Sequence, residues 1–573
     1  MGKIIRIQMP EGTVRVEDTP AEYAGWGGRG LTCMILAAEV PPACHPLGSR
    51  NKLVIAPGTL AGTTAPNSGR LSLGCKSPLT GGIKESNAGG TPGYKLGRLG
   101  IDAIVLEGLQ REREWHILHV SKEGARLLPG GEYAGLKNYE LVKKLQSKFG
   151  EKVGILSIGP VGEMRLAAAS IAATDTSGLP CRHAARGGPG AVMGSKGLKA
   201  VVVDDGGAGK AHLAEPEKFR EGARRCAKAF KSNPFIDRLK DYGTAILVKG
   251  INGAGALPTR NFREGVFEGA DRIDGQYMRE VILKRGGKPS HAGCSTCIIQ
   301  CSNVYVDEKG EYITSSLEYE TIWAHGANLG ISDLDSIARA DRLCDEYGMD
   351  TIEVGAAIGV AMDAGVKSFG DAQGALQLLE EVGTGTPLGR ILGSGAEVSG
   401  KVFGITRVPT VKHQSMAAYD PRAIHGMGVT YATSTMGADH TAGVVVHQNL
   451  EGELNPHRPE GQVDVNREVQ IRLAAVDCTG LCLLANRPIF LNPEGLRGLL
   501  EMLGAKFGVP YTIEDFFAMG KKVLKAERDF NLAAGMSKAD DRLPEFFKEE
   551  KIPPHNVAFT ASDEELDRFF GEF

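Results

Sequence analysis

The segment His291-Ala-Gly-Cys294-Ser-Thr-Cys297-Ile-Ile-Gln-Cys301 carries three cysteines in the spacing C-x2-C-x3-C. Thiolates at this spacing can turn inward around an iron–sulfur cubane, and a distant fourth cysteine commonly completes the set. The alternative is zinc, but structural zinc sites usually have a second cysteine pair or histidines at matching spacing. The segment lacks that second half, so it predicts an iron–sulfur cluster whose remote ligand is either Cys482 or Cys478.

A six-residue pattern, D-x-x-G-[LM]-[CD], occurs twice in the chain. The copies are Asp345-Glu-Tyr-Gly348-Met349-Asp350 and Asp477-Cys-Thr-Gly480-Leu481-Cys482. Each closes a stretch of helical spacing, as an ordinary glycine C-cap also would. A carboxylate followed by glycine presents acceptor oxygens beside open backbone, which suits the N–H donors of a pterin or guanine ring. Two copies predict two rings or one ring bound twice, and the second copy makes Cys482 the preferred fourth ligand.

Periodicity divides the chain into a β-rich part and a helical part. Short apolar runs between Gly, Pro and Asn predict strands in the first two hundred residues. The expected strands are 53–56, 71–73, 103–106, 115–120, 153–158, 167–173 and 200–203. After a glycine-rich linker at 204–210, helical spacing predominates. The expected helices are 215–232, 334–347, 352–364, 372–383, 466–476 and 494–507.

These elements predict an α+β fold with three domains. A β-rich N-terminal domain is expected at 1–208. It is followed by two mainly helical domains, at 209–400 with the cysteine loop and the first D-x-x-G motif, and at 401–573 with the second motif.

Bulk properties exclude several classes of function. The 573 residues carry a net charge of −3, so no broad attraction to nucleic acid or anionic membranes is expected. There is no run of about 18 uncharged apolar residues, so no membrane span is expected. Residues 1–7 alternate like a strand and lack the apolar run of a signal peptide.

Cysteine usage indicates the compartment. The 11 cysteines without a secretory signal favour a reducing, cytoplasmic location with metal or redox chemistry. Those outside the proposed ligand set are expected to be small buried apolar residues. They are Cys33, Cys44, Cys75, Cys181, Cys226, Cys344 and Cys478.

Further motifs accompany these in order along the chain. They are Gly27-Gly-Arg-Gly30, Ser68-Gly-Arg70, Ser77-Pro-Leu-Thr-Gly81, Ser86-Asn-Ala-Gly-Gly90, Arg186-Gly-Gly-Pro-Gly-Ala-Val-Met-Gly-Ser-Lys196, Glu318-Tyr-Glu-Thr321 and Gly437-Ala-Asp-His440. With the cysteine loop and both D-x-x-G motifs, the chain resembles the tungsten-containing aldehyde:ferredoxin oxidoreductases over nearly its full length.

The resemblance implies the fold and the cofactors of that family. It implies a bis-pterin site in which four dithiolene sulfurs hold tungsten, or molybdenum, with no protein ligand. It implies a 4Fe–4S cluster on Cys294, Cys297, Cys301 and Cys482. Arg70 would lie between pterin and cluster, where a planar guanidinium can donate to both.

The resemblance also implies which residues contact the pterin and its phosphates. A turn at 86–90 would approach the phosphates through backbone groups, and carbonyls of Asn87 and Ala184 would hold a magnesium ion between them. The implied cofactor-binding residues are Arg70, Asn87, Ala88, Gly89, Arg182, Ala184, Arg186, Gly187, Asp345, Gly348, Met349, Asp350, Asp477, Gly480 and Leu481.

The activity that the resemblance implies is oxidation of small aldehydes to carboxylic acids. Electrons would pass through the cluster to ferredoxin or to an iron–sulfur partner subunit. His440 would donate to the substrate oxygen, since imidazole exchanges protons near neutral pH. Glu318 or Glu320 would activate water or accept a proton if burial raises its pKa. Tyr419 would add a donor, and His325 would lie near the site.

Three alternative functions differ in how well the sequence supports them. Gly25-x-Gly27-x-x-Gly30 fits a dinucleotide fingerprint but follows no clear strand of a βαβ unit, so NAD binding is not expected. The active-site subunit of a larger tungsten reductase complex, of the benzoyl-CoA reductase kind, stays open. So does a non-catalytic iron–sulfur electron-transfer subunit, which would need neither the second D-x-x-G motif nor a large β-rich domain.

The oligomeric state also stays open. Some relatives use an E-x-x-H motif to bind a metal between two subunits, and this sequence contains no such motif. A homodimer and a hetero-oligomer therefore both remain compatible with the sequence.

Overall fold

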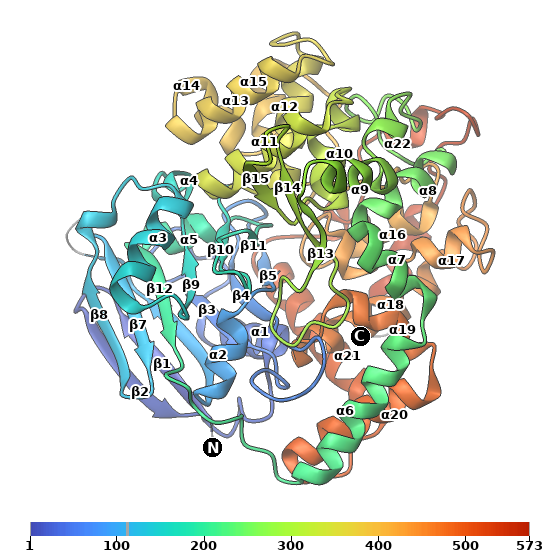
Figure 1. Cartoon of the computed structure of the whole chain (residues 1–573). Helices are drawn as coiled ribbons and strands as arrows, with labels where there is room; N and C mark the ends of the chain where they lie inside the picture. The colour runs from blue at the N-terminus through green and yellow to red at the C-terminus, as the bar shows by residue number, and fades with distance from the viewer. Residues whose placement is uncertain (1, 111–113, 572) are drawn as a thin grey trace.

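Two six-stranded β-sheets form the N-terminal part of the computed structural model, which describes residues 2–110, 114–571 and 573 (Figure 1). The first sheet contains β1 (Lys3–Gln8), β2 (Thr13–Asp18), β3 (Leu53–Pro57), β4 (Leu71–Lys76), β5 (Ile83–Ala88) and β6 (Ile101–Glu107), in the order β2-β1-β6-β3-β4-β5. The second contains β7 (His116–Ser121), β8 (Gly124–Pro129), β9 (Gly154–Ser157), β10 (Ile171–Ala173), β11 (Arg182–Ala184) and β12 (Leu198–Asp204), in the order β11-β10-β9-β12-β7-β8.

The second sheet repeats the topology of the first. Read from the opposite edge, its order β8-β7-β12-β9-β10-β11 matches β2-β1-β6-β3-β4-β5 strand for strand. In each sheet the pair β1–β6 or β7–β12 is parallel and the other neighbours are antiparallel. Helices α1 (Gly28–Glu39) and α3 (Asn138–Phe149) follow the two hairpins, and α2 (Pro92–Arg98) and α5 (Pro189–Ser195) precede the last strands. The β-rich part is therefore a structural duplication, which the sequence analysis did not detect.

Strands β3, β4 and β12 are buried on both faces, which explains their continuous apolar runs. Successive strand side chains point to opposite faces. Leu53 and Ile55 enter a core that also contains Val201 and Val203 of the second sheet. Val54 and Ala56, between and beside them, pack instead against the α1 side of the sheet.

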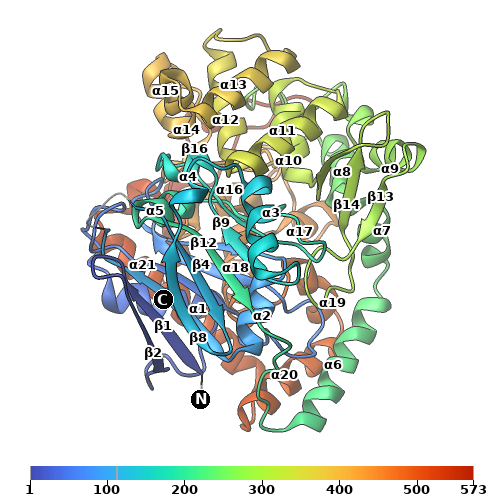
Figure 2. The same ribbon diagram turned by 60° about the vertical axis from the view of Figure 1, so that its left-hand side comes forward.

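The rest of the chain is mainly helical (Figure 2). Its longer helices are α6 (Pro216–Lys231), α9 (Gly275–Lys284), α11 (Leu334–Tyr347), α12 (Thr351–Asp363), α13 (Ala372–Thr384), α18 (Gln462–Thr479), α20 (Pro493–Phe507) and α21 (Ile513–Ala533). Shorter ones near the site are α7 (Pro234–Tyr242), α10 (Tyr319–His325), α16 (His425–Thr433), α17 (Val446–Leu450) and α19 (Asn486–Phe490). The strands β13 (Lys288–His291), β14 (Ser302–Val306) and β15 (Tyr312–Ser315) form a small sheet, and the cysteine loop connects the first two.

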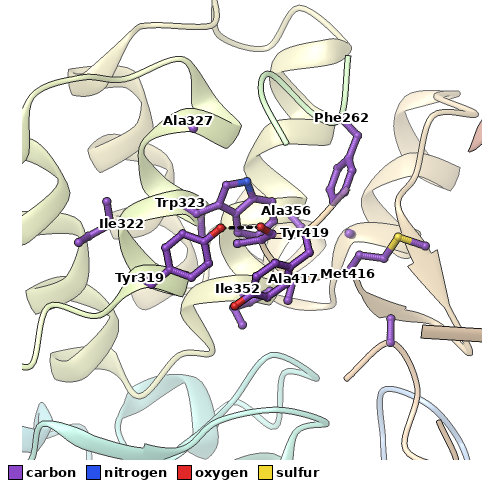
Figure 3. Packing of buried hydrophobic residues seen from close by; sticks show 14 of the residues in the cluster. Phe262, Tyr319, Ile322, Trp323, Ala327, Ile352, Ala356, Met416, Ala417 and Tyr419 are labelled. Atoms are coloured by element: carbon purple, nitrogen blue, oxygen red, sulfur yellow. Dashed lines mark hydrogen bonds between the residues drawn. The ribbon is translucent and has the colours of Figure 1, made fainter. Parts of the chain in front are cut away.

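A large aromatic and aliphatic core holds this helical part together. Trp323 is fully buried, donates from Nε1 to the carbonyl of Pro258 at 2.7 Å, and meets Phe262 edge to face. Figure 3 shows Tyr319 and Tyr419 in the same cluster, and their ring centroids are 5.6 Å apart.

The predicted α+β fold class is confirmed, and most predicted elements lie inside observed ones. The expected strand at 167–173 is wrong for 167–170, because only Ile171–Ala173 pair with a neighbouring strand. The first two hundred residues also contain more helix than expected, notably α1, which begins inside the quoted motif Gly27-Gly-Arg-Gly30. The predicted turn at 86–90 is wrong for 86–88, which pair along β4 as part of β5. The predicted strand at 1–7 corresponds to β1, with Met1 outside the described residues.

The three predicted domains, 1–208, 209–400 and 401–573, stay a prediction. The last strand of the sheets ends at Asp204 and α6 begins at Pro216, on either side of the predicted linker. Within the described residues, no single helix is long and apolar enough to cross a membrane. Residues Gln462–Thr479 and Leu483–Phe490 pass such a test only as a pair bent by 117°.

Two pairs of glycines join the β-sheets to the D-x-x-G motifs. Gly58 follows β3, and a Cβ there would lie 2.0 Å from the backbone nitrogen of Gly480. Gly159 follows β9, and a Cβ there would lie 2.2 Å from the carbonyl oxygen of Tyr347 and 2.8 Å from the nitrogen of Gly348. The duplicated sheets therefore dock the two motifs through equivalent loops, at distances that exclude any side chain.

We predict that Gly58→Ala and Gly159→Ala each destabilise the protein by about 1–3 kcal/mol, because backbone must move to make room for the methyl group. The midpoint of guanidinium denaturation measures this effect. Gly131→Ala is the control, since no described atom lies within 4 Å of a Cβ at that position. Equal midpoints for all three variants would contradict the close contact.

Candidate active site and metal centre

Both D-x-x-G motifs end a long helix with a left-handed glycine. Gly348 caps α11 with φ 74° and Gly480 caps α18 with φ 78°. A residue with a side chain is strained in this conformation, so glycine is required at both positions. Asp350 then caps the next helix, α12, by accepting from the nitrogen of Ile352. The caps confirm the predicted helix ends and direct both motifs toward the interface with the sheets.

A cavity of about 360 Å³ lies where these elements meet. Its lining combines predicted residues from both halves of the chain: Arg70, Asn87, Arg182, Arg186, Glu318, Asp350, His440, Asp477, Cys294, Cys297, Cys301 and Cys482. Glu85, His183, Asp439 and Thr441 also line it and were not predicted as site residues. Glu85 and Asp439 stand within or next to quoted motifs, and this position could have identified them as site residues. No quoted motif contains His183, whose Nε2 lies 2.9 Å from Asp345.

The remaining predicted pterin contacts surround this cavity without lining it. They are Ala88, Gly89, Ala184, Gly187, Asp345, Gly348, Met349, Gly480 and Leu481. Strands β5 and β11, which carry Asn87 and Ala184, are edge strands of their sheets and pack against each other. A Cβ on Gly89 would lie 2.4 Å from the Sγ of Cys294, so glycine is needed for the cysteine loop to approach β5.

Asn67 joins the cysteine loop to Cys482. Its nitrogen donates to the carbonyl of Thr296 at 3.0 Å, and its Oδ1 accepts from the nitrogen of Ile298 at 3.0 Å. Its carbonyl accepts from the nitrogen of Cys482 at 2.9 Å. One residue therefore holds both parts of the predicted ligand set together, although both follow Asn67 in the sequence by more than two hundred residues.

The two candidates for the remote ligand are separated by the fold. Cys482 lines the cavity with the three loop cysteines. Cys478 is fully buried in the core beside α1, and its Sγ lies 3.1 Å from the carbonyl of Ala474. The seven cysteines expected to be buried apolar residues are all buried, whereas the four predicted ligands are partly exposed.

The four thiols line one cavity. Among the described residues, no three His, Cys, Asp or Glu side chains are placed to hold one metal ion. A cavity lined by four thiols fits a polynuclear iron–sulfur group by the chemistry of its donors. Burial raises the pKa of Cys297 to about 11 and also raises the pKa of Cys301 and Cys482, so metal binding would have to displace these protons.

Two arginines lie among the thiols. Arg70 donates from Nε to the Oδ1 of Asn87, and its nitrogen donates to the carbonyl of Gly480 at 3.2 Å. Arg182 lies 3.3 Å from Glu318 through Nη1, and its buried Nε has no hydrogen-bond partner in the described parts of the chain. A buried, unpartnered guanidinium nitrogen at a cavity wall fits a bound anionic or acceptor group.

Carboxyl groups at the second motif form a buried cluster. Arg29 binds Glu527 through Nε and Nη2 at 2.8 and 2.7 Å, and its Nη1 lies 3.4 Å from Asp477. Burial first, and the neighbouring Glu85 second, raise the pKa of Asp477 well above its ordinary value. Burial also raises the pKa of Glu85. With a pKa raised to about 8, Asp477 holds its proton at neutral pH, so it offers both a donor and an acceptor to a heterocycle.

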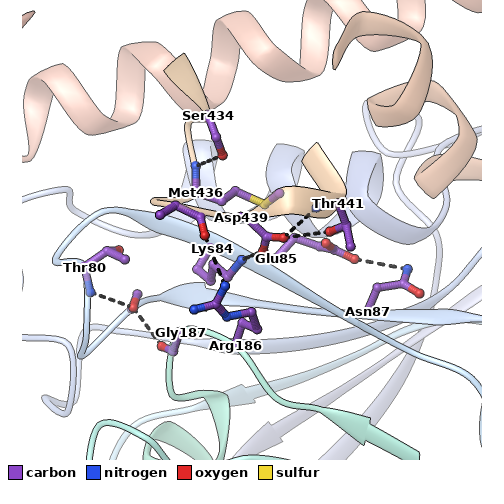
Figure 4. A network of polar contacts seen from close by, with 12 residues as sticks. Thr80, Lys84, Glu85, Asn87, Arg186, Gly187, Ser434, Met436, Asp439 and Thr441 are labelled. Atoms are coloured by element: carbon purple, nitrogen blue, oxygen red, sulfur yellow. Dashed lines mark hydrogen bonds and ion pairs between the residues drawn. The ribbon is translucent and has the colours of Figure 1, made fainter. Parts of the chain in front are cut away.

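A second polar network fixes the loop that carries His440 (Figure 4). Lys84 of β5 is buried and donates to Asp439 at 2.5 Å. Asp439 accepts from the nitrogen and hydroxyl of Thr441 at 3.1 and 2.7 Å. Arg186 lies 3.3 Å from Asp350 and donates to the carbonyl of Ala438 at 3.1 Å. These contacts tie the loop at 437–442 to both sheets.

The predicted acid–base residues meet in an adjoining chamber of about 230 Å³, which Glu318, Glu320, Tyr419 and His440 all line. His440 Nε2 lies 3.4 Å from Glu320 Oε1, an oxygen that accepts no hydrogen bond from the described residues. The other oxygen of Glu320 accepts from the nitrogen of Ala418 at 3.0 Å. Burial raises the pKa of Glu320, whereas Glu318 binds Ser316, Thr244 and Arg182. The geometry favours Glu320 as the partner of His440.

His325 lies apart from this chamber. It is buried in the helical core with Nε2 3.7 Å from the Sγ of Cys344, and burial lowers its pKa to about 4. It lines neither cavity. The expectation that it lies near the site is wrong, because α10 turns its last residue toward α11 rather than toward His440.

Comparison with known proteins identifies relatives of the whole chain. It is 36% identical over 598 residues to the tungsten-containing aldehyde ferredoxin oxidoreductase of Pyrococcus abyssi, covering 99% of this chain and 95% of the relative. The protein of the same name from Thermococcus kodakarensis is 36% identical over 596 residues, with the same coverages. The WOR-like subunit of aliphatic sulfonate oxidoreductase from Pyrococcus furiosus is 24% identical, covering 98% and 92%.

A solved structure shares the fold. The active site complex BamBC of benzoyl coenzyme A reductase, bound to 1,5-dienoyl-CoA, superposes with a TM-score of 0.81 at 18% identity. The match covers 99% of this chain and 93% of the other. At this identity the likeness concerns the fold alone.

Two family models divide the sequence between them. Residues 4–205 match the N-terminal domain of aldehyde ferredoxin oxidoreductase, and residues 221–573 match its domains 2 and 3. With the full-length identities to the archaeal enzymes, these matches show that the chain belongs to the aldehyde ferredoxin oxidoreductase family.

Proposed function

We propose that the protein oxidises aldehydes to carboxylic acids at a bis-pterin tungsten centre and passes electrons through a 4Fe–4S cluster to ferredoxin or an iron–sulfur partner subunit. One observation carries the proposal: the four ligand cysteines, both D-x-x-G helix ends and His440 lie around two adjoining cavities. The archaeal relatives are named for tungsten, aldehyde and ferredoxin, which supports the same assignment.

The residues around the larger cavity fit the cofactors by their chemistry. Cys294, Cys297, Cys301 and Cys482 would hold the cluster, and the carbonyls of Asn87 and Ala184 would hold magnesium at the pterin phosphates. The pterin edges would contact the two motifs, with Asp345 and Asp350 at one and Asp477 at the other, and Arg70, Arg182 and Arg186 would face anionic or acceptor atoms. When bound, the metal centre would supply two-electron redox chemistry and the cluster would supply single-electron transfer. The residues do not distinguish tungsten from molybdenum.

His440 and Glu320 are proposed to move the protons of the reaction. His440 Nε2 would donate to the aldehyde oxygen, and Glu320 Oε1, 3.4 Å away, would exchange that proton with it or accept one from water. Burial and the charge of Glu320 raise the pKa of Tyr419 well above its ordinary value, so its hydroxyl stays a donor. Glu318 is proposed to orient Arg182 rather than to act as the base, because Ser316, Thr244 and Arg182 already occupy its oxygens.

We predict that His440→Asn lowers kcat about 100-fold or more, as expected for the loss of a general acid. Tungsten and iron contents should not change, since His440 is not among the proposed ligands. Steady-state kinetics with a viologen acceptor and metal analysis of the same preparation measure both. An unchanged kcat would refute the role of His440.

The raised pKa of Glu320 predicts a pH dependence. Glu320 can act as a base only when its carboxyl group is ionised, and this form is lost when the pH falls through its raised pKa. The acid-side fall in kcat/KM should therefore occur at a higher pH than the ordinary pKa of a glutamate. Glu320→Gln should abolish this limb along with most activity. Above that pKa, the buried charge costs stability, so the Gln variant should unfold at no lower temperature than the parent. A parent profile that is flat on the acid side would exclude Glu320 as the base.

The cluster assignment is tested by iron content. Cys482→Ala should reduce iron from about four atoms per chain to about three or fewer in anaerobically purified protein, because one iron of the cubane loses its thiolate. Cys226→Ala is the matched control, since Cys226 is fully buried in the contact between α6 and α20. Full iron retention in Cys482→Ala would overturn the assignment.

The alternative, a subunit of a larger reductase complex, shares this scaffold. The structural likeness to benzoyl coenzyme A reductase shows a common fold at 18% identity and does not favour that reaction. An aldehyde panel assayed with a viologen acceptor separates the two, because only the proposed function gives aldehyde-dependent reduction.

A further inference from the structure

Three cavities adjoin one another in series, from the deep cavity beside the cysteines to the surface. The deep cavity and the chamber of about 230 Å³ share Thr244, Glu318, His440, Leu483 and Leu484 in their walls. That chamber and an outer cavity of about 690 Å³ share Phe235, Leu247, Val446, His447 and Arg487. Leu491, in the outer wall, is 70% exposed, so the outer cavity opens to solvent. A substrate that follows this route passes the second group of residues before it reaches His440.

Three side chains from three short helices converge at that passage. Phe235 comes from α7, His447 from α17 and Arg487 from α19. The Phe235 ring meets the His447 ring edge to face at 5.6 Å, and the Arg487 guanidinium lies 5.7 Å from the Phe235 centroid. Arg487 Nη1 lies 2.7 Å from Nδ1 of His447. These contacts make Phe235, His447 and Arg487 one packed group, called the gate below.

Glu451 holds Arg487, one residue of the gate, from the solvent side. Arg487 binds both of its oxygens, at 2.8 and 2.7 Å, in the planar two-bond geometry that fixes a guanidinium. Glu451 itself is about half exposed, so it can be changed without disturbing the core. The positive charge of Arg487 is therefore neutralised at the entrance rather than directed to an incoming molecule.

The chamber behind the gate is mainly apolar. Its apolar walls are Phe235, Leu247, Tyr319, Tyr419, Val444, Val446, Leu483 and Leu484. Each charged side chain in its wall already has a partner among the described residues: Glu318 has Arg182, Glu320 has His440 and Arg487 has Glu451. An anionic substrate tail would lose its hydration in the chamber and find no free cation there, which is unfavourable.

We propose that the gate and the apolar chamber determine substrate specificity, admitting aldehydes with uncharged, apolar tails and limiting the size of the tail. The inference rests on the proposed aldehyde oxidation and adds the substrate class. The gate residues act on entry and fit of the tail, whereas His440 and Glu320 act on the reacting group.

Size selection is tested with acetaldehyde and cyclohexanecarboxaldehyde on the holoenzyme. Phe235→Ala, and Phe235→Leu as a milder change, should raise the ratio of kcat/KM for the large over the small aldehyde about 10-fold. Val446→Phe should lower the ratio by a similar factor, because the larger side chain leaves less room for the large aldehyde. A change of a few methylene groups in an apolar pocket alters the preference between two substrates by about 10-fold or more. Phe507→Ala is the matched control, because its exposed ring lies on α20 outside the three cavities.

Charge selection is tested with butyraldehyde and the anionic succinic semialdehyde. The parent should prefer butyraldehyde. Glu451→Gln should shift the ratio toward succinic semialdehyde about fivefold, because it frees the charge of Arg487 at the entrance. Ratios that stay within twofold of the parent for the Phe235, Val446 and Glu451 variants would overturn the proposal.

An unreactive ligand separates this inference from the proposed function. Cyclohexyl methyl ketone should bind the parent holoenzyme in calorimetry, and Val446→Phe should weaken binding about 10-fold. If the parent oxidises no aldehyde but binds the ketone in this Val446-dependent way, the proposed reaction fails while the chamber's selectivity stands. If aldehydes are oxidised and neither the ratios nor ketone binding respond to the variants, the gate proposal alone fails.

Discussion

The backbone-to-backbone contacts of Gly58 with Gly480 and of Gly159 with Gly348 are the constraint on which the site depends. At these contacts a single Cβ would come within 2.0–2.8 Å of main-chain atoms, so the sheets and the D-x-x-G helix ends meet without side chains between them. The duplicated topology supplies two equivalent loops for two equivalent motifs. Close docking brings Arg70 and Asn67 of one half against Gly480 and Cys482 of the other. The cavity therefore exists only where the two halves of the chain meet.

Many charged side chains are buried at this junction, and most of them form ion pairs with an oppositely charged side chain. Arg29 with Glu527, Lys84 with Asp439 and Arg186 with Asp350 are all buried ion pairs. Such pairs contribute little net stability, because desolvation offsets their attraction, but losing one partner is costly. Their common property is position: each connects the β-rich N-terminal part to an element of the second half. They fix the relative geometry of the motifs. The Nε of Arg182, which has no hydrogen-bond partner among the residues that the structure describes, marks where a bound group would complete the network.

The site has two compartments with different chemistry. Arginines, thiols and acids surround the cavity of about 360 Å³, which suits charged cofactors. Apolar side chains and the Glu320–His440 pair line the chamber of about 230 Å³. His440 lines both, since the loop held by Lys84 and Asp439 lies between them. This placement allows one imidazole to face a substrate in the chamber while its loop remains anchored to the sheet that faces the cofactor side.

The sequence by itself determined the local chemistry: the cysteine spacing, the two glycine-capped helix ends and the runs that became β3, β4, β6 and β12 all depend on neighbouring residues. It also gave the family resemblance, which the full-length comparisons confirm. It could not reveal the duplication, because similar backbone paths arise there from different side chains. The repeated motif already favoured Cys482 over Cys478, and the fold places Cys482 beside the loop cysteines. Only tertiary structure decided that Glu320 rather than Glu318 meets His440, and that His325 lies in the core. Each of these depends on contacts between segments far apart in the chain, and residue spacing carries no information about such contacts.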